Sequence, residues 1–265
     1  MAFYEHASEA TGTAMRFGIY LPPQAAKGPC PALYYLAGLT CTEETFAIKG
    51  GAQRYAAEHG LILVCPDTSP RGLDLPGETE SWDFGAGAGF YLDATEAPWA
   101  GHYRMASYVT QELVTLVEAE FPVSRERRGV FGHSMGGHGA LVTALRDPAR
   151  WHSVSAFAPI CNPVAVPWGQ KAFPRYLGAD ETAWAKWDAS LLMRQRAYPG
   201  EILVDQGLAD QFLEGQLRPE ALEAAAAVTK QKLVVRRHEG YDHSYWFIQS
   251  FMGDHIAHHA RQLHG

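Results

Sequence analysis

The stretch GVFGHSMGGHGALVTALR, residues 129–146, joins a short apolar run to an apolar helical segment through a turn rich in glycine. Its centre matches the pattern G-x-S-x-G, and we expect a strand at Gly129–Phe131 and a helix at Gly137–Arg146, the context that this pattern requires. A sharp turn between strand and helix crowds the backbone near Ser134, so the positions beside the serine need glycine. The turn lifts the hydroxyl above the sheet edge and puts the Met135 amide at a helix N-terminus, where it can donate to a developing oxyanion. Ser134 is therefore the candidate nucleophile.

Apolar runs that are typical of strands alternate with helical segments along the whole chain. We expect strands at Met15–Leu21, Ala32–Ala37, Leu61–Cys65, Gly129–Phe131, Val154–Ala158, Ile202–Val204 and Lys232–Arg236. We expect helices at Tyr103–Glu120, Gly137–Arg146, Pro219–Lys230 and Ser244–Leu263. Continuous apolar runs suit strands that are buried on both faces of a parallel sheet. The alternation predicts an α/β fold with a doubly wound, mostly parallel sheet and helices on both faces, built as a single domain over residues 1–265.

The composition argues against several classes of protein. Hydrophobic residues make up 47% of the 265 residues, which is enough for a packed core. The 22 Lys and Arg are outnumbered by 29 Asp and Glu, and the resulting net charge of −7 argues against a nucleic-acid partner. No apolar run is long enough to cross a membrane, and no basic stretch followed by an apolar run opens the chain. We therefore expect no membrane partner and a cytoplasmic location.

The sequence indicates neither a metal site nor a nucleotide site. The four cysteines show no C-x-x-C spacing, so they predict neither a disulfide scaffold nor a zinc site. The phosphate-binding pattern GxxxxGK[ST] is missing, and the GAGAG run at 85–89 follows no clear strand and precedes no clear helix. We interpret Ser81–Tyr91 instead as a tight active-site loop flanked by aromatic residues.

A serine hydroxyl is a poor nucleophile unless a base, and a group that orients the base, lie beside it. Asp210 comes shortly after the strand expected at Ile202–Val204, and His243 comes after the strand expected at Lys232–Arg236. The carboxyl ends of parallel strands are where α/β sheets gather their sites, and the chain order Ser, Asp, His suits this fold. We expect His243 to be the base and Asp210 to orient it.

Two other aspartates compete with Asp210 for the orienting role. Asp205 lies closer to the end of the same strand and could be a structural turn residue. Asp242 is adjacent to His243 in the chain, which makes a well-aligned contact between the two awkward. A second oxyanion donor is expected in the loop after the strand at Ala32–Ala37, and the Leu39 amide is the candidate.

The remaining histidines have simpler interpretations. His133 and His138 flank the candidate nucleophile, and we expect them to pack around the turn rather than to act as bases. His255, His258 and His259 lie on the terminal helix with no nearby pair of carboxylates. A metal site is therefore less favoured there than a solvated helix face.

Six segments of the chain carry a resemblance to a known family. They are YLAGLTCTEETF (35–46), SWDFGAGAGFY (81–91), GHSMGGHGAL (132–141), NPVAVPWGQKAF (162–173), DQGLADQFL (205–213) and GYDHSYWFI (240–248). Together they resemble the S-formylglutathione hydrolase family, the esterase D family of α/β-hydrolases, over essentially the whole chain. The resemblance implies a triad of Ser134, Asp210 and His243, with the Leu39 and Met135 amides as oxyanion donors. It also implies hydrolysis of S-formylglutathione to formate and glutathione, no cofactor, and a homodimer.

The resemblance also bears on substrate binding. It places Cys41 beside the active site as a thiol sensitive to thiol reagents, although we do not expect it to be the nucleophile. Glutathione conjugates are anionic, as this chain is, so local cations must compensate; Lys171 is the candidate, with Trp82 and Trp168 as parts of the wall. Alternative functions are a broader carboxylesterase or acyltransferase acting on small acyl esters, and a catalytically silent binding protein.

Overall fold

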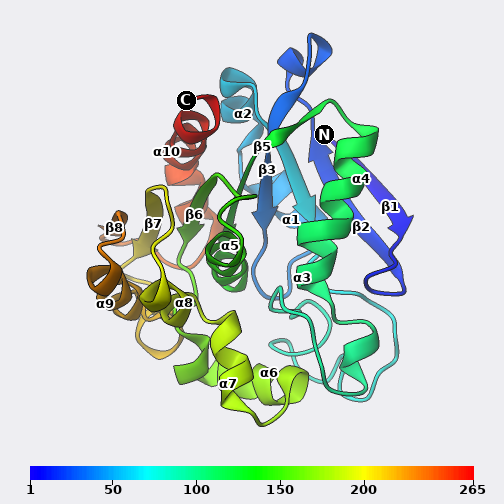
Figure 1. The fold of residues 1–265 in the computed structure, drawn as a ribbon, viewed down its shortest axis with the longest axis vertical. Helices are drawn as coiled ribbons and strands as arrows, with labels where there is room; N and C mark the ends of the chain where they lie inside the picture. The colour runs from blue at the N-terminus through cyan, green and yellow to red at the C-terminus, as the bar shows by residue number, and fades with distance from the viewer.

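An eight-stranded sheet forms the centre of the computed structural model, which describes residues 1–265 (Figure 1). The strands are β1 (Ala2–Ala7), β2 (Ala14–Tyr20), β3 (Cys30–Leu36), β4 (Ile62–Pro66), β5 (Val123–His133), β6 (Ser153–Phe157), β7 (Ile202–Gly207) and β8 (Leu233–His238). Their order across the sheet is β1-β2-β4-β3-β5-β6-β7-β8. β2 pairs antiparallel with both β1 and β4, whereas the other neighbours are parallel. The expected mostly parallel α/β sheet is confirmed.

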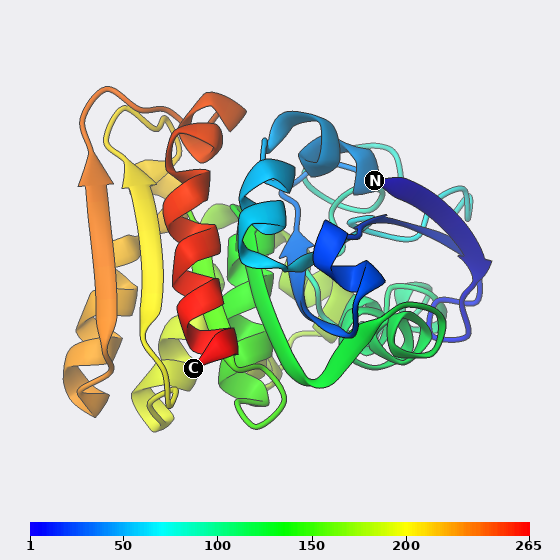
Figure 2. The same ribbon diagram turned by 90° about the horizontal axis from the view of Figure 1, so that it is seen from above.

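Helices cover both faces of this sheet. They are α1 (Glu43–Lys49), α2 (Gln53–His59), α3 (Met105–Ser107), α4 (Leu113–Glu120), α5 (Met135–Arg146), α6 (Pro167–Leu177), α7 (Glu181–Trp184), α8 (Ala189–Gln195), α9 (Pro219–Thr229) and α10 (Tyr245–His264). Shorter 3-10 and π segments are η1 (Pro23–Ala26), η2 (Trp99–Gly101), η3 (Tyr108–Glu112), η4 (Pro163–Ala165), η5 (Ala185–Trp187) and η6 (Leu213–Leu217). Helix α5 packs on β3, β5 and β6, and α10 packs on β5, β6 and β7 from the opposite side (Figure 2). None of the helices is long and apolar enough to cross a bilayer.

Some elements are absent from the sequence-based prediction for physical reasons. β1 is an edge strand whose side chains are nearly all exposed, so no apolar run reveals it. Helices α1 and α2 have seven residues each, which is too short to show a clear helical period. The helix expected at Tyr103–Glu120 is present in three pieces, with the π-helix η3 between α3 and α4.

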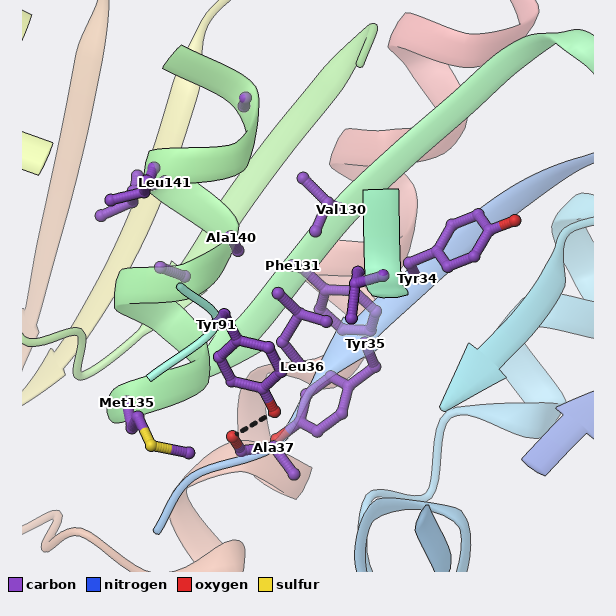
Figure 3. Packing of buried hydrophobic residues seen from close by; sticks show 14 of the residues in the cluster. Tyr34, Tyr35, Leu36, Ala37, Tyr91, Val130, Phe131, Met135, Ala140 and Leu141 are labelled. Atoms are coloured by element: carbon purple, nitrogen blue, oxygen red, sulfur yellow. Dashed lines mark hydrogen bonds between the residues drawn. The ribbon is translucent and has the colours of Figure 1, made fainter. Parts of the chain in front are cut away.

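The core surrounds the two central strands β3 and β5, and 71 buried hydrophobic residues form one cluster. Phe131 of β5 packs edge-on against Tyr35 of β3, with ring centroids 4.9 Å apart. The Tyr91 hydroxyl donates a hydrogen bond to the Ala37 carbonyl at 2.8 Å, as Figure 3 shows. This bond ties the loop that follows β4 to the end of β3, directly before the turn at residues 38–41.

The face of α10 that we expected to be solvated is buried, so this expectation was wrong. His255, His258 and His259 are at most 1% exposed and lie against the sheet. Two serines of β6 explain the difference. Ser155 Oγ lies 2.8 Å from His255 Nδ1 and 2.8 Å from His259 Nε2, and Ser153 Oγ lies 2.7 Å from His259 Nδ1. The strand therefore supplies the polar partners that allow histidines to be buried.

This hydrogen-bonded chain ends at Asp205 of β7. His255 Nε2 lies 3.1 Å from Asp205 Oδ2, and the Arg236 guanidinium donates to both oxygens of the same carboxylate at 2.6 Å. Burial alone would raise the pKa of Asp205, but the hydrogen bonds from His255 and Arg236 outweigh burial and hold this pKa well below its usual value. Asp205 is thus an ionised, acceptor-only group, and it anchors α10 to β7 and β8.

An acceptor-only group at one end fixes the position of every proton along the chain. His255 must carry its hydrogen on Nε2, because that atom faces the carboxylate. Its Nδ1 is then an acceptor, so the Ser155 hydroxyl donates to it and in turn accepts from Nε2 of His259. The Ser153 hydroxyl donates to the remaining nitrogen of His259. Both rings are neutral in this arrangement, in agreement with burial, which lowers the pKa of each.

We expect both His255 and His259 to be Nε2–H tautomers in solution at neutral pH. A two-bond proton–nitrogen correlation spectrum of the imidazoles distinguishes protonated from bare ring nitrogens. The variant Ser153→Ala is the matched control, because it removes only the hydrogen bond farthest from Asp205 and leaves both tautomers unchanged. A hydrogen on Nδ1 of either ring in the wild-type protein would contradict the derived proton order.

Five buried histidines make the fold sensitive to acid. Burial lowers the pKa of His138 and of His258 to about 4, and it also lowers the pKa values of His133, His255 and His259. Below about pH 6.5 the unfolded chain binds protons that the folded chain does not. The free energy of unfolding therefore falls as the pH falls, by up to about 1.4 kcal/mol per pH unit for each histidine.

We expect this slope between about pH 6.5 and pH 4.5 in chemical denaturation curves. His138→Leu removes one of these histidines and should flatten the slope. The substitution breaks no hydrogen bond, because neither ring nitrogen of His138 has a partner. His152→Leu, at an exposed position, serves as the control. Equal slopes for wild type and His138→Leu would contradict the explanation.

Candidate active site

Ser134 lies on the turn between β5 and α5 in a backbone conformation that side chains rarely adopt, with φ 57° and ψ −120°. Its N–H donates to the Phe157 carbonyl of β6 at 3.0 Å. A Cβ on Gly136 would lie 1.9 Å from the Leu36 carbonyl oxygen of β3, and one on Gly132 would lie 2.3 Å from the Gly136 carbonyl oxygen. The glycines predicted beside the serine are therefore required, because the start of α5 touches the end of β3.

The imidazole of His243 lies against the carboxylate of Asp210. His243 Nδ1 and Asp210 Oδ2 are 2.5 Å apart, and the Asp210 side chain is completely buried. The Phe212 N–H donates to the other oxygen, Oδ1, at 2.8 Å, which fixes the carboxylate. Since an ionised carboxylate only accepts, Nδ1 of His243 carries the hydrogen and Nε2 is left to receive a proton.

The competing aspartates have other partners. Asp205 is completely buried and holds Arg236 and His255 behind the sheet. Asp242 accepts a hydrogen bond from the Ser244 N–H at the start of α10, at 2.9 Å. The structure therefore brings Asp210, and neither competitor, to His243.

A cavity of about 380 Å³ brings Ser134 and His243 together, because both line it. The Asp210 carboxylate holds Nδ1 of the imidazole, so Nε2 is the nitrogen left for the Ser134 hydroxyl. Three aromatic residues form a connected wall, with Trp82 against Trp168 at 5.8 Å and Trp168 against Phe212 at 4.8 Å between ring centroids. No group of three or more His, Cys, Asp or Glu side chains is arranged to hold a metal ion.

Two backbone N–H groups near Ser134 lack partners and are the candidates for the expected oxyanion site. Met135 is the first residue of α5, so its N–H has no partner within the helix. The Leu39 N–H makes no hydrogen bond within the chain, and Leu39 lines the cavity beside Ser134. The neighbouring Thr40 N–H donates to the Gly87 carbonyl at 2.9 Å, so the glycine-rich loop fixes the turn. A Cβ on Gly87 would lie 3.1 Å from the Thr40 Cα, which explains why this loop needs glycine.

Comparison with known proteins places this site in a family. Residues 8–258 match the family described as Putative esterase. The chain is 57% identical to the S-formylglutathione hydrolase of Mus musculus and 56% identical to that of Paracoccus denitrificans, over 98% of this chain and 93% and 92% of those proteins. The solved structure of an S-formylglutathione hydrolase from Agrobacterium tumefaciens is 50% identical, with a TM-score of 0.96 over 98% of this chain and 94% of that one. The chain belongs to the S-formylglutathione hydrolase family. The α/β-hydrolase fold expected from the resemblance is confirmed.

Of the three binding residues expected from the family resemblance, two line the cavity and one does not. Trp168 is buried, and Trp82 is 55% exposed at the rim. Lys171 lies outside the lining, because its ammonium forms an ion pair with Asp83 and a hydrogen bond of 2.6 Å with Ser81 Oγ. The structure thus corrects the expectation of a free cation at this position: the lysine holds the loop that presents Trp82.

The structure adds lining residues that the sequence interpretation missed. Phe212 packs edge-on to the His243 ring at 5.0 Å, and its signal was its place two residues after Asp210. Lys49 and Thr45 lie on α1, an element that was not expected. Cys41 lines the cavity as predicted. Burial raises the pKa of its thiol, so the side chain stays protonated at neutral pH and is a poor nucleophile.

We expect Gly136→Ala to lower kcat at least tenfold and to destabilise the fold by about 1–3 kcal/mol, because the added methyl forces α5 away from β3 and displaces Ser134. Gly101→Ala is the matched control, since a Cβ at Gly101 meets no atom within 4 Å. Esterase assays and thermal denaturation measure the two effects. Normal activity in Gly136→Ala would refute the claim that this contact positions the serine.

Proposed function

We propose that this protein hydrolyses S-formylglutathione to formate and glutathione, with Ser134, His243 and Asp210 as its catalytic triad. The observation that supports the triad most directly is the meeting of Ser134 and His243 in one cavity, with the buried Asp210 carboxylate 2.5 Å behind the imidazole. The substrate is inferred from relatives of 55–57% identity that are named S-formylglutathione hydrolase and are matched over 98% of this chain.

In the first half of the reaction, His243 Nε2 takes the proton of the Ser134 hydroxyl as the oxygen attacks the formyl carbonyl carbon. Asp210 keeps the imidazole in the correct tautomer and stabilises its positive charge. The Leu39 and Met135 amides receive the oxyanion, a contribution of roughly 3–4 kcal/mol for a well-placed donor. The thioester bond then breaks and glutathione leaves, either as a thiol that takes the proton from His243 or as a thiolate while the imidazolium gives its proton to solvent, so that His243 is neutral again for the second half.

In the second half, water hydrolyses the formyl ester on Ser134. His243 removes a proton from the water as it attacks the ester carbonyl, and the proton returns to the serine oxygen when formate leaves. Thiolate is a better leaving group than alkoxide, so acid catalysis by the imidazole matters less in the first half than in the second. Every step uses groups of this chain and a water molecule.

The family resemblance also supports a homodimer, and the composition of the sequence favours a cytoplasmic location; we include both in the proposal. The molecular mass in solution, compared with 29.1 kDa for one chain, tests the first. Fractionation of cells that produce the protein tests the second.

We expect purified wild-type protein to turn over S-formylglutathione and Ser134→Ala to lose about a thousandfold or more of kcat, because the nucleophile is gone. Cys41→Ala should retain turnover, which separates the serine from the only thiol that lines the cavity. The assay follows the loss of the thioester. A wild type that cleaves p-nitrophenyl esters, with no preference for formyl over longer acyl groups and no activity on S-formylglutathione, would favour the broader carboxylesterase.

A further inference from the structure

The proposed substrate presents the cavity with negative charge. Glutathione carries two carboxylates and one ammonium group at neutral pH, and the protein has a net charge of −7. Overall electrostatic attraction therefore does not bring the substrate in, and recognition of the carboxylates needs a cation at the cavity itself.

The cavity has one Lys or Arg side chain in its lining, that of Lys49, and no Asp or Glu. Lys49 is the last residue of α1, and its ammonium lies 6.0 Å from the centroid of the Tyr245 ring, which also lines the cavity. The exposed ammonium makes neither an ion pair nor a hydrogen bond within the protein. It is available to an anion that enters the cavity.

The other cations near the cavity are already paired. Lys171 is bound to Asp83, and Arg71 donates to the Asp67 carboxylate at 2.7 Å and to the Cys41 carbonyl at 2.9 Å. Since breaking such a pair would cost the energy of the existing contacts, these side chains are poorer carboxylate ligands than an ammonium that only water solvates.

The backbone of Lys49 is fixed relative to the triad. Its carbonyl accepts a hydrogen bond of 2.6 Å from Gln249 Nε2 of α10, the helix that begins two residues after His243. The same last turn of α1 is held by a second hydrogen bond, which Gln53 Nε2 donates to the Ala47 carbonyl at 2.5 Å. The side chain therefore starts from a defined point at the edge of the cavity.

We propose that Lys49 binds a carboxylate of the glutathione part of the substrate and thereby selects anionic glutathione thioesters over neutral esters. This inference rests on the proposed function, but it concerns binding of the leaving group and not the chemistry at Ser134. An exposed charge pair is worth little in free energy and is screened by salt, so its contribution should be modest and should fall as ionic strength rises.

The first test measures kcat and KM for S-formylglutathione and for p-nitrophenyl acetate in Lys49→Ala, Lys49→Glu and Lys49→Arg. We expect the ratio of kcat/KM for the thioester to that for the neutral ester to fall about two- to fivefold in Lys49→Ala and further in Lys49→Glu, mainly through KM, and to recover in Lys49→Arg. Lys27→Ala, an exposed lysine outside the cavity lining, has the same change of charge and should behave as wild type.

The second test does not require turnover of S-formylglutathione. S-methylglutathione and its diamide, in which both carboxylates are neutral, are compared as inhibitors of p-nitrophenyl acetate hydrolysis. Wild type should bind the acid about two- to fivefold more tightly than the diamide, and Lys49→Ala should lose that preference. Equal preference in wild type and Lys49→Ala would overturn the role of Lys49. Failure of wild type to hydrolyse S-formylglutathione in the first test would instead overturn the proposed function.

Discussion

The active site depends on the close contact between the start of α5 and the end of β3. At Gly136 a Cβ would lie 1.9 Å from the Leu36 carbonyl oxygen, so the helix can approach this far only without a side chain. The contact forces Ser134 into a left-handed conformation, and such backbone strain costs of order 1–3 kcal/mol. Packing of α5 on β3, β5 and β6 offsets the strain and holds the hydroxyl in place. The same turn leaves the Met135 amide without a partner in the helix, so one constraint positions both the proposed nucleophile and a proposed oxyanion donor.

His243 and Asp210, the other two residues of the proposed triad, are held by contacts with the sheet. His243 precedes α10, and α10 is bound to β6 and β7 through the buried chain of His255, His259 and their serine partners, which ends at Asp205. Asp210 follows β7 and is fixed by its own backbone contact with Phe212. Helix α10 and the Asp210 loop thus take their positions from the same strand. The distance between His243 and Asp210 is therefore set by elements that pack on β7.

The local part of this arrangement was predictable from the sequence, and the long-range part was not. The strand, the G-x-S-x-G turn and the helix of Ser134 lie within 24 consecutive residues, 123–146, so their pattern alone indicates the structure. Asp205 lies in β7 and Asp210 shortly after it, and the sequence favoured Asp210 because Asp205, closer to the end of the expected strand, could be a structural turn residue. What separates them is that Arg236 and His255 already bind Asp205, a contact made through the fold. The ion pair of Lys171 could not be foreseen for the same reason, because its partner, Asp83, is 88 residues away.

The terminal histidines lead to a consequence for redesign of this protein. A chain of hydrogen bonds in which each member both gives and receives has a direction, and here one carboxylate at its end sets that direction. No member can be exchanged for an apolar residue without leaving its neighbour without a partner in a dry interior. The two serines, the two imidazole rings and the carboxylate therefore form one interdependent unit. They can be replaced together by well-packed hydrocarbon, but substitution one residue at a time passes through intermediates that are less stable than either end.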